Sequence, residues 1–287
     1  MNTDEMMAVH KAWYSIPEVA FQIARSAYGR EFALLPPKWI DHSEASTRCL
    51  RCHNTAHFNF LMCDLLHAYQ KAIPYQCYCS LASYAIDGEP GIPRMSANLQ
   101  ARDTQGWRHE HWKHMVGYDW LIDIDSPSHS AKHMDLARQT ALSVVDELTL
   151  QEMPMQVRYS GCGYHIIVPA SALRPDSYDP DNEESTYKFL LSETKKLADD
   201  FGELIDLGVN DDRRVTKAPY SLSIYRNGIF AVWPLKNRKE LERFEPGMAA
   251  AARLIDDPGL RAEIRDRGTP TWPAIEIGMP VLEAQHG

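Results

Sequence analysis

The chain has 287 residues, a formal net charge of −9, 44% hydrophobic residues and 24% charged residues. This composition is typical of a globular protein that forms one large domain or two closely packed ones. Because no run of about eighteen apolar residues occurs and the first residues lack a secretory signal, we expect a cytoplasmic protein with no membrane partner. The negative charge argues against broad non-specific nucleic-acid binding, although it allows a local basic groove.

The first part of the sequence predicts two helices, a strand and a loop. Apolar residues at helical spacing predict a helix over residues 14–36, which the pair Pro36 and Pro37 would end. A second amphipathic helix is expected over 57–73, a strand over 76–86 and a polar loop over 87–108.

The remainder of the chain alternates strands with helices. The expected elements are a strand over 118–125, a serine-capped helix over 126–149, strands over 156–160 and 164–170, a helix over 185–205, a hairpin around Asn227 and Gly228, and short helices after it. This alternation predicts the α/β or α+β class, built on a mixed sheet.

Two aspartates stand in an otherwise apolar strand with the sequence YDWLIDIDSPS. Asp123 and Asp125 are two residues apart, so their side chains point to the same face of the strand. Two neighbouring carboxylates repel each other unless a cation lies between them, and carboxylate oxygens favour Mg²⁺ or Mn²⁺. The alternative is a strand end at the sheet edge, where both acids meet water.

A second block, RYSGCGYHIIVP, places a hydroxyl, two glycines and a histidine between two strands. Gly161 and Gly163 would let the backbone approach a ligand, while Ser160 and His165 could hydrogen-bond phosphate oxygens. The alternative is a tight turn with a packed histidine.

A third block, over residues 204–228, adds the acid Asp206 and then a basic run that contains Arg213, Arg214 and Lys217. Acids that bind a metal and bases that bind phosphate, close together in the sequence, are typical of a nucleotide polyphosphate site.

The order of these blocks resembles the motifs of the archaeo-eukaryotic primase superfamily, in particular those of the primase small (catalytic) subunit. The matching segments are LIDID (121–125), SGCGYH (160–165), IDLGVND (205–211) and KAPYSLS (217–223), flanked by GREFALL (29–35) and IFAVWPLKNRKELERFEP (229–246). The resemblance implies an α/β (α+β) fold in which an RRM-like catalytic core packs on an N-terminal α/β module. The implied division is an N-terminal module over 1–110, the core over 111–250 and a C-terminal helical tail over 251–287.

The resemblance also implies the roles of individual residues. It makes Asp123, Asp125 and Asp206 the catalytic, metal-binding triad. The implied nucleotide-binding residues are Ser160, Gly161, Gly163, His165, Lys217, Ser221, Ser223, Arg226 and Arg48. Two positions depart from the family pattern, because Cys162 stands where an arginine is usual and Ser223 replaces the histidine that ends the S-L-H motif.

The implied activity is that of a DNA-directed primase or polymerase, which joins nucleoside triphosphates on a single-stranded DNA template with two Mg²⁺ or Mn²⁺ ions. A primer, and a separate primase large subunit or helicase, are the further partners expected. Three alternatives stay open: a gap-filling or end-joining repair polymerase that only extends primers, a non-catalytic nucleic-acid-binding subunit, and a metal-dependent phosphohydrolase.

The cysteines offer a second metal-binding candidate. CLRCHNTAH contains Cys49 and Cys52 at a spacing that suits zinc, with two histidines nearby. The alternative for the following cysteines, Cys77 and Cys79 among them, is that they are small buried apolar side chains.

Overall fold

The structure, a computed structural model, describes residues 2–28, 30–35, 37, 47–49, 76–84, 115–173, 183–209, 214–225 and 228–272. The expected helix over 57–73, the loop over 87–108, Cys52 and Arg226 lie outside these residues. Arg48 and Cys49 belong to a described strand, of which the backbone pairing is known.

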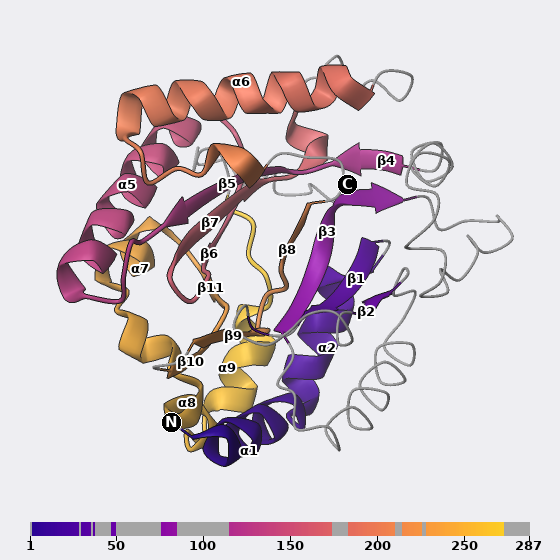
Figure 1. Cartoon of the computed structure of the whole chain (residues 1–287), viewed down its shortest axis with the longest axis vertical. Coiled ribbons are helices and arrows are strands. Elements are labelled where there is room, and N and C mark those ends of the chain that lie inside the picture. Colours follow the sequence, from indigo (N-terminus) through magenta and orange to yellow (C-terminus); the bar gives the residue numbers. More distant parts are fainter. Residues whose placement is uncertain are drawn as a thin grey trace, which may run out of the picture.

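Two antiparallel sheets form the centre of the molecule (Figure 1). The first has the order β2-β1-β3-β4, and β8 also pairs with β3. Its strands are β1 (Arg30–Leu35), β2 (Thr47–Cys49), β3 (Gln76–Tyr84), β4 (Met115–Tyr118) and β8 (Val215–Lys217). The second has the order β11-β6-β7-β5. Its strands are β5 (Trp120–Asp125), β6 (Gln156–Tyr159), β7 (Gly163–Val168) and β11 (Trp233–Leu235). Strands β9 (Leu222–Tyr225) and β10 (Gly228–Ala231) form a separate pair.

Helices surround the two sheets (Figure 1). Beside the second sheet lie α5 (Ala131–Leu150), α6 (Glu183–Phe201) and α7 (Arg238–Arg243). Near the N-terminus lie α1 (Thr3–Tyr14) and α2 (Pro17–Ser26), which contact α8 (Ala251–Ile255) and α9 (Leu260–Arg267), respectively. Short 3₁₀ turns are η2 (Ala170–Ala172), η4 (Leu207–Val209) and η5 (Pro246–Ala249). No described helix combines the length and the apolar character needed to cross a membrane.

The second sheet has one apolar face and one face that carries polar groups. Ile122 and Ile124 of β5 are fully buried, whereas Asp123 and Asp125 alternate with them on the opposite face. Helix α5 packs against β7 and β5 and buries the apolar face. Ser130 caps α5 by accepting a hydrogen bond from the backbone N–H of His133. One face of the sheet therefore supplies the core and leaves the other for function.

The prediction of one helix over residues 14–36 is wrong. Helix α2 ends at Ser26, and the segment that follows forms β1, paired with β2 on one side and β3 on the other. Phe32 and Leu34 are buried there at the two-residue spacing of a strand. The apolar residues of REFALL fit the periodicity of a helix as well as that of a strand. Pairing with β3 therefore determines that this segment is a strand.

Most of the other described elements follow their predicted positions. The predicted strand over 76–86 is β3, the strands over 156–160 and 164–170 are β6 and β7, and the helix over 185–205 is α6. The predicted helix over 126–149 starts only at Ala131, after its Ser130 cap. The predicted α/β or α+β class is confirmed by this arrangement, but the expected mixed sheet is wrong, because all paired strands among the described residues are antiparallel.

Part of the predicted core contributes strands to the first sheet. Strands β4 and β8 lie within the predicted core over 111–250, yet both pair with β3 of the N-terminal segment. The ion pair of Arg30 with Asp119 (2.6 Å) links β1 to the residue between β4 and β5. The boundaries at residues 110 and 250 remain a prediction.

Candidate active site

Asp206 reaches the two strand aspartates because its segment pairs with the outer edge of β5. The backbone N–H of Asp206 donates to the carbonyl of Asp123 (2.9 Å), and that of Asp125 donates to the carbonyl of Leu204 (3.0 Å). Ile124 and Ile205 form the antiparallel bridge between these two hydrogen bonds. Residues 204–206 thus act as a short additional strand beside β5.

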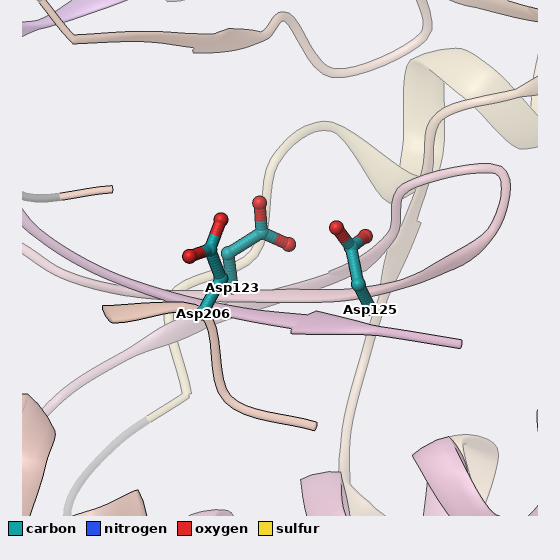
Figure 2. Close-up of side chains that lie close together, drawn as sticks. All are labelled: Asp123, Asp125 and Asp206. Atoms are coloured by element: carbon teal, nitrogen blue, oxygen red, sulfur yellow. The ribbon is translucent and has the colours of Figure 1, made fainter. Parts of the chain in front are cut away.

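The three carboxylates converge on one side of the sheet (Figure 2). Asp123, Asp125 and Asp206 each offer one oxygen, and these atoms lie within 4.8 Å of one another. Within the described part of the chain, they are the group of three acidic, cysteine or histidine side chains that could share a metal ion. Oxygen ligands from carboxylates suit Mg²⁺ or Mn²⁺.

Asp123 is the most confined of the three. Burial raises the pKa of its carboxyl to about 7, and the nearby Asp125 and Asp206 charges add to this effect, while Lys217 and Arg214 oppose it. Its Oδ1 atom is buried and has no hydrogen-bond partner among the residues that the structure describes. A cation among the three carboxylates would occupy this place, so the residues present fit a divalent metal.

A row of polar side chains crosses the same face of the sheet. In the strand register, Asp123 of β5 lies opposite His165 of β7, which in turn lies opposite Arg158 of β6. Directly opposed residues point to the same face, so the three side chains are neighbours. His165 Nε2 lies 3.4 Å from Asp123 Oδ1.

Hydrogen bonds fix the orientation of His165. Arg158 Nη2 donates to Thr216 Oγ1 (2.9 Å), and that hydroxyl lies 3.0 Å from His165 Nδ1. When Thr216 donates its own proton to Nδ1, the imidazole proton sits on Nε2 and faces the aspartates. Burial, together with the charges of Arg158 and Lys217, holds the pKa of His165 well below its usual value, so the ring is neutral. Its Nε2–H is a donor for an anionic ligand.

A cavity of about 420 Å³ opens above the three aspartates. Besides the acids, it is lined by two basic side chains, Arg214 and Lys217, and by His165. Tyr78 and Tyr225 lie on its wall, and burial raises the pKa of both phenols, so both hydroxyls stay protonated at neutral pH. Acids and bases therefore face one cavity, as a metal-bound polyphosphate would require.

Lys217 is tied closely to the protein. Its ammonium group donates to the carbonyl of Ser160 (3.0 Å), to Ser223 Oγ (2.8 Å) and to the hydroxyl of Tyr225 (3.4 Å). Ser160 and Ser223 are both buried. The serine that replaces the histidine of the S-L-H motif therefore serves to position Lys217.

The two glycines make room for protein atoms. A Cβ atom on Gly163 would lie 2.0 Å from the carbonyl oxygen of Ile124, in the neighbouring strand. Gly161 has φ +103°, and a Cβ atom there would lie 2.3 Å from the Ser223 side chain. Both glycines are needed for close packing around the site, and their predicted contact with nucleotide remains a prediction.

Two further predicted residues differ in their position. His165 lines the cavity, whereas Ser221 is fully buried, does not line it, and has a hydroxyl with no partner among the described residues. Cys162, at the position where an arginine is usual, also lines the cavity. The motif comparison gave no role to Tyr78, Thr216 or Tyr225. Tyr78 of β3 and Thr216 of β8 both line the cavity, and the pairing of these two strands brings them to the site.

The cysteines of β3 belong to no potential metal-binding group within the described part of the chain. Cys77 and Cys79 are buried, and burial raises the pKa of the Cys77 thiol to about 12. For these two residues, the alternative of small apolar side chains is the better description. The predicted zinc site at Cys49 and Cys52 stays a prediction, since Cys52 lies outside the described residues.

Comparison with known proteins supports the fold. No family model matches the chain, and no curated protein matches it. Among solved structures, the chain is similar to the polymerase domain of Mycobacterium tuberculosis ligase D, determined in complex with DNA. The identity is 12%, the TM-score is 0.50, and the match covers 93% of this chain and 90% of that chain. The predicted α/β (α+β) class is therefore confirmed, as a fold similar to that of this polymerase domain.

Proposed function

We propose that this protein is a metal-dependent nucleotidyltransferase that joins nucleoside triphosphates to a nucleic-acid chain on a single-stranded DNA template. The observation that carries the proposal is the convergence of Asp123, Asp125 and Asp206 beneath a cavity that also holds basic side chains. The similarity to a polymerase domain whose structure contains DNA supports the same class of reaction.

Each group at the site has a part in the proposed reaction. The three aspartates would hold a divalent cation, Mg²⁺ or Mn²⁺, and the two cations of such a site would lower the pKa of a primer 3′-hydroxyl and stabilise the leaving pyrophosphate. Arg214 and Lys217 face the cavity and attract the triphosphate. His165 presents its Nε2–H to a phosphate oxygen without adding charge.

Primer extension is the form of the activity that the basic side of the cavity favours. All three ammonium hydrogens of Lys217 have partners within the protein, and Ser223 stands where a histidine would add a phosphate contact. A polymerase that extends a primer binds one incoming nucleotide, whereas a primase that starts a chain must bind two free nucleotides at once. A site with few phosphate contacts therefore suits primer extension better. We therefore place a gap-filling or end-joining polymerase ahead of a primase that starts chains, which is the second candidate.

The test is incorporation of labelled nucleotides on a single-stranded template, with and without primer, in Mg²⁺ and in Mn²⁺. Growth of a primer supports the polymerase, and products without primer support the primase. Binding of DNA without incorporation would indicate a non-catalytic subunit, and release of phosphate without chain growth would indicate a phosphohydrolase.

Aspartate variants connect the activity to the site. Asp123→Asn and Asp125→Ala should each lower incorporation by more than about 100-fold, because a metal ligand is lost while the fold is kept. Asp200→Asn removes an exposed acid from α6 and is the matched control. Retained incorporation in either site variant, with an unchanged circular dichroism spectrum, would sink the proposal.

A further inference from the structure

A second polar cavity adjoins the candidate active site, since Thr216 of β8 lines both cavities. The second cavity has a volume of about 340 Å³ and is lined by three arginines, Arg25, Arg30 and Arg158, with one acid, Asp119. Its lining is therefore cationic.

Arg158 is the unusual member of this lining. The residue is 4% exposed, and its one hydrogen bond among the described residues goes from Nη2 to Thr216. Among the described residues, its buried Nε–H has no hydrogen-bond partner, and no carboxylate lies within ion-pair distance. A guanidinium has five N–H donors, and burying its charge with so few partners is costly.

The other groups around the cavity do not supply the missing partner. Arg30 already pairs with Asp119 and donates to the carbonyls of Ser80 and Leu81. Its charge repels that of Arg158, and together with burial it lowers the pKa of Arg158 to about 10, which still leaves the group charged at neutral pH. Thr269 Oγ1 is a second buried polar atom that has no hydrogen-bond partner in the described part of the chain.

We propose that this cavity, between Arg158, Arg30, Arg25 and Thr269, is a binding site for a phosphate-type oxyanion. Such an anion accepts several hydrogen bonds at once, so it could use the unpartnered Nε–H of Arg158 and the hydroxyl of Thr269. It would also offset the excess positive charge of the lining. By holding the Arg158 guanidinium, it would stabilise the hydrogen bonds from Arg158 through Thr216 to His165.

The site can be tested without any nucleotide-transfer assay, so its failure and that of the proposed function are distinguishable. The probe is inorganic phosphate, titrated into the full chain in EDTA and followed by isothermal calorimetry, with pyrophosphate in a second series. We expect saturable binding of one anion per chain. The pyrophosphate series tells whether the site takes a single phosphate or a diphosphate group.

Variants separate this cavity from the candidate active site. Arg25→Gln, at an exposed position, and Thr269→Val, which keeps the side-chain shape, should each weaken phosphate binding, Arg25→Gln by about tenfold or more. Two control variants, Arg253→Gln on α8 and Lys217→Gln in the cavity above the aspartates, should leave the affinity for phosphate unchanged. The proposal is overturned if wild-type protein binds no phosphate, if Arg25→Gln and Thr269→Val bind as wild type does, or if Lys217→Gln abolishes binding.

Discussion

At residue 163, the backbone of β7 passes so close to β5 that a single methyl group has no place. The contact at 2.0 Å would be with the Ile124 carbonyl, which belongs to the strand that carries Asp123 and Asp125. Backbone atoms cannot move aside as a flexible side chain can. The spacing of the aspartates from His165 therefore depends on the absence of a side chain at residue 163.

We expect Gly163→Ala to destabilise the protein by about 2–4 kcal/mol, because β5 and β7 must separate to admit the methyl group. The same substitution at Gly247 is the control, since a Cβ atom there would meet nothing within 4 Å. Urea unfolding of both variants measures the difference. Equal stabilities for the two would show that the strands adjust without cost.

Single residues of the site were predictable where the chemistry is local in sequence. Asp123 and Asp125 share a face by strand periodicity alone, and motif order then indicated Asp206. The roles of Arg158 and Thr216 were not predictable, because they depend on which strands pair and in what register. The close packing at Gly161 and Gly163 was also not predictable, because a Cβ atom at either position would meet protein atoms from other strands.

At the scale of elements, helix α1 is held to the β9 segment by two side chains. Trp13 Nε1 donates to the carbonyl of Tyr220 (2.8 Å), and the hydroxyl of Tyr14 accepts from the backbone N–H of Leu222 (2.9 Å). Both contacts join residues more than two hundred positions apart in the sequence. The start of the chain therefore supports the segment that positions Ser223 and Lys217.

Tyr14→Phe should destabilise the protein by about 1–3 kcal/mol, because it leaves the Leu222 N–H buried without a partner. Tyr28→Phe removes the same hydroxyl from a side chain that is 54% exposed, and it should change stability by less than about 0.5 kcal/mol. Thermal unfolding compares the pair. A similar effect for both variants would contradict the role given to the Tyr14 hydroxyl.

Long-range contacts also explain why the prediction of one helix over residues 14–36 is wrong. The sequence pattern over 14–36 suits a helix, and α2 does form over part of it. Residues 30–35 become β1 because β3 offers a partner for their backbone groups. Elements such as α5 and β5, with a clear period and a cap or turn at their ends, were predictable from local pattern alone.

For the whole molecule, Arg267 near the end of α9 joins three separated parts of the chain. Its guanidinium donates to Glu240 of α7 through Nη1 (2.7 and 2.8 Å) and to the carbonyl of Pro234 in β11 (2.9 Å), and it pairs with Glu263 on its own helix (2.7 Å). It also lies 4.9 Å from the ring centre of Trp233. The C-terminal helices are thus part of the same folded unit as the second sheet.

Arg267→Ala should lower the free energy of unfolding by about 3–5 kcal/mol, since it removes the hydrogen bonds of a buried guanidinium to Pro234 and to the half-buried Glu240 carboxylate. Arg265→Ala, at an exposed position on the same helix, should have an effect below about 0.5 kcal/mol. Guanidinium unfolding of the two variants gives the comparison. If Arg267→Ala unfolds as wild type does, α9 is not bound to the core through this residue.

The short segment that carries Asp206 has a consequence for how the protein behaves at high concentration. Without residues 204–206, β5 would expose the open edge of the second sheet, and an open edge invites strands of other molecules to pair with it. The two backbone hydrogen bonds that bring Asp206 to Asp123 also cover this edge. Resistance to aggregation and the geometry of the acidic site therefore rest on the same few residues, so a change that loosens the segment affects both at once.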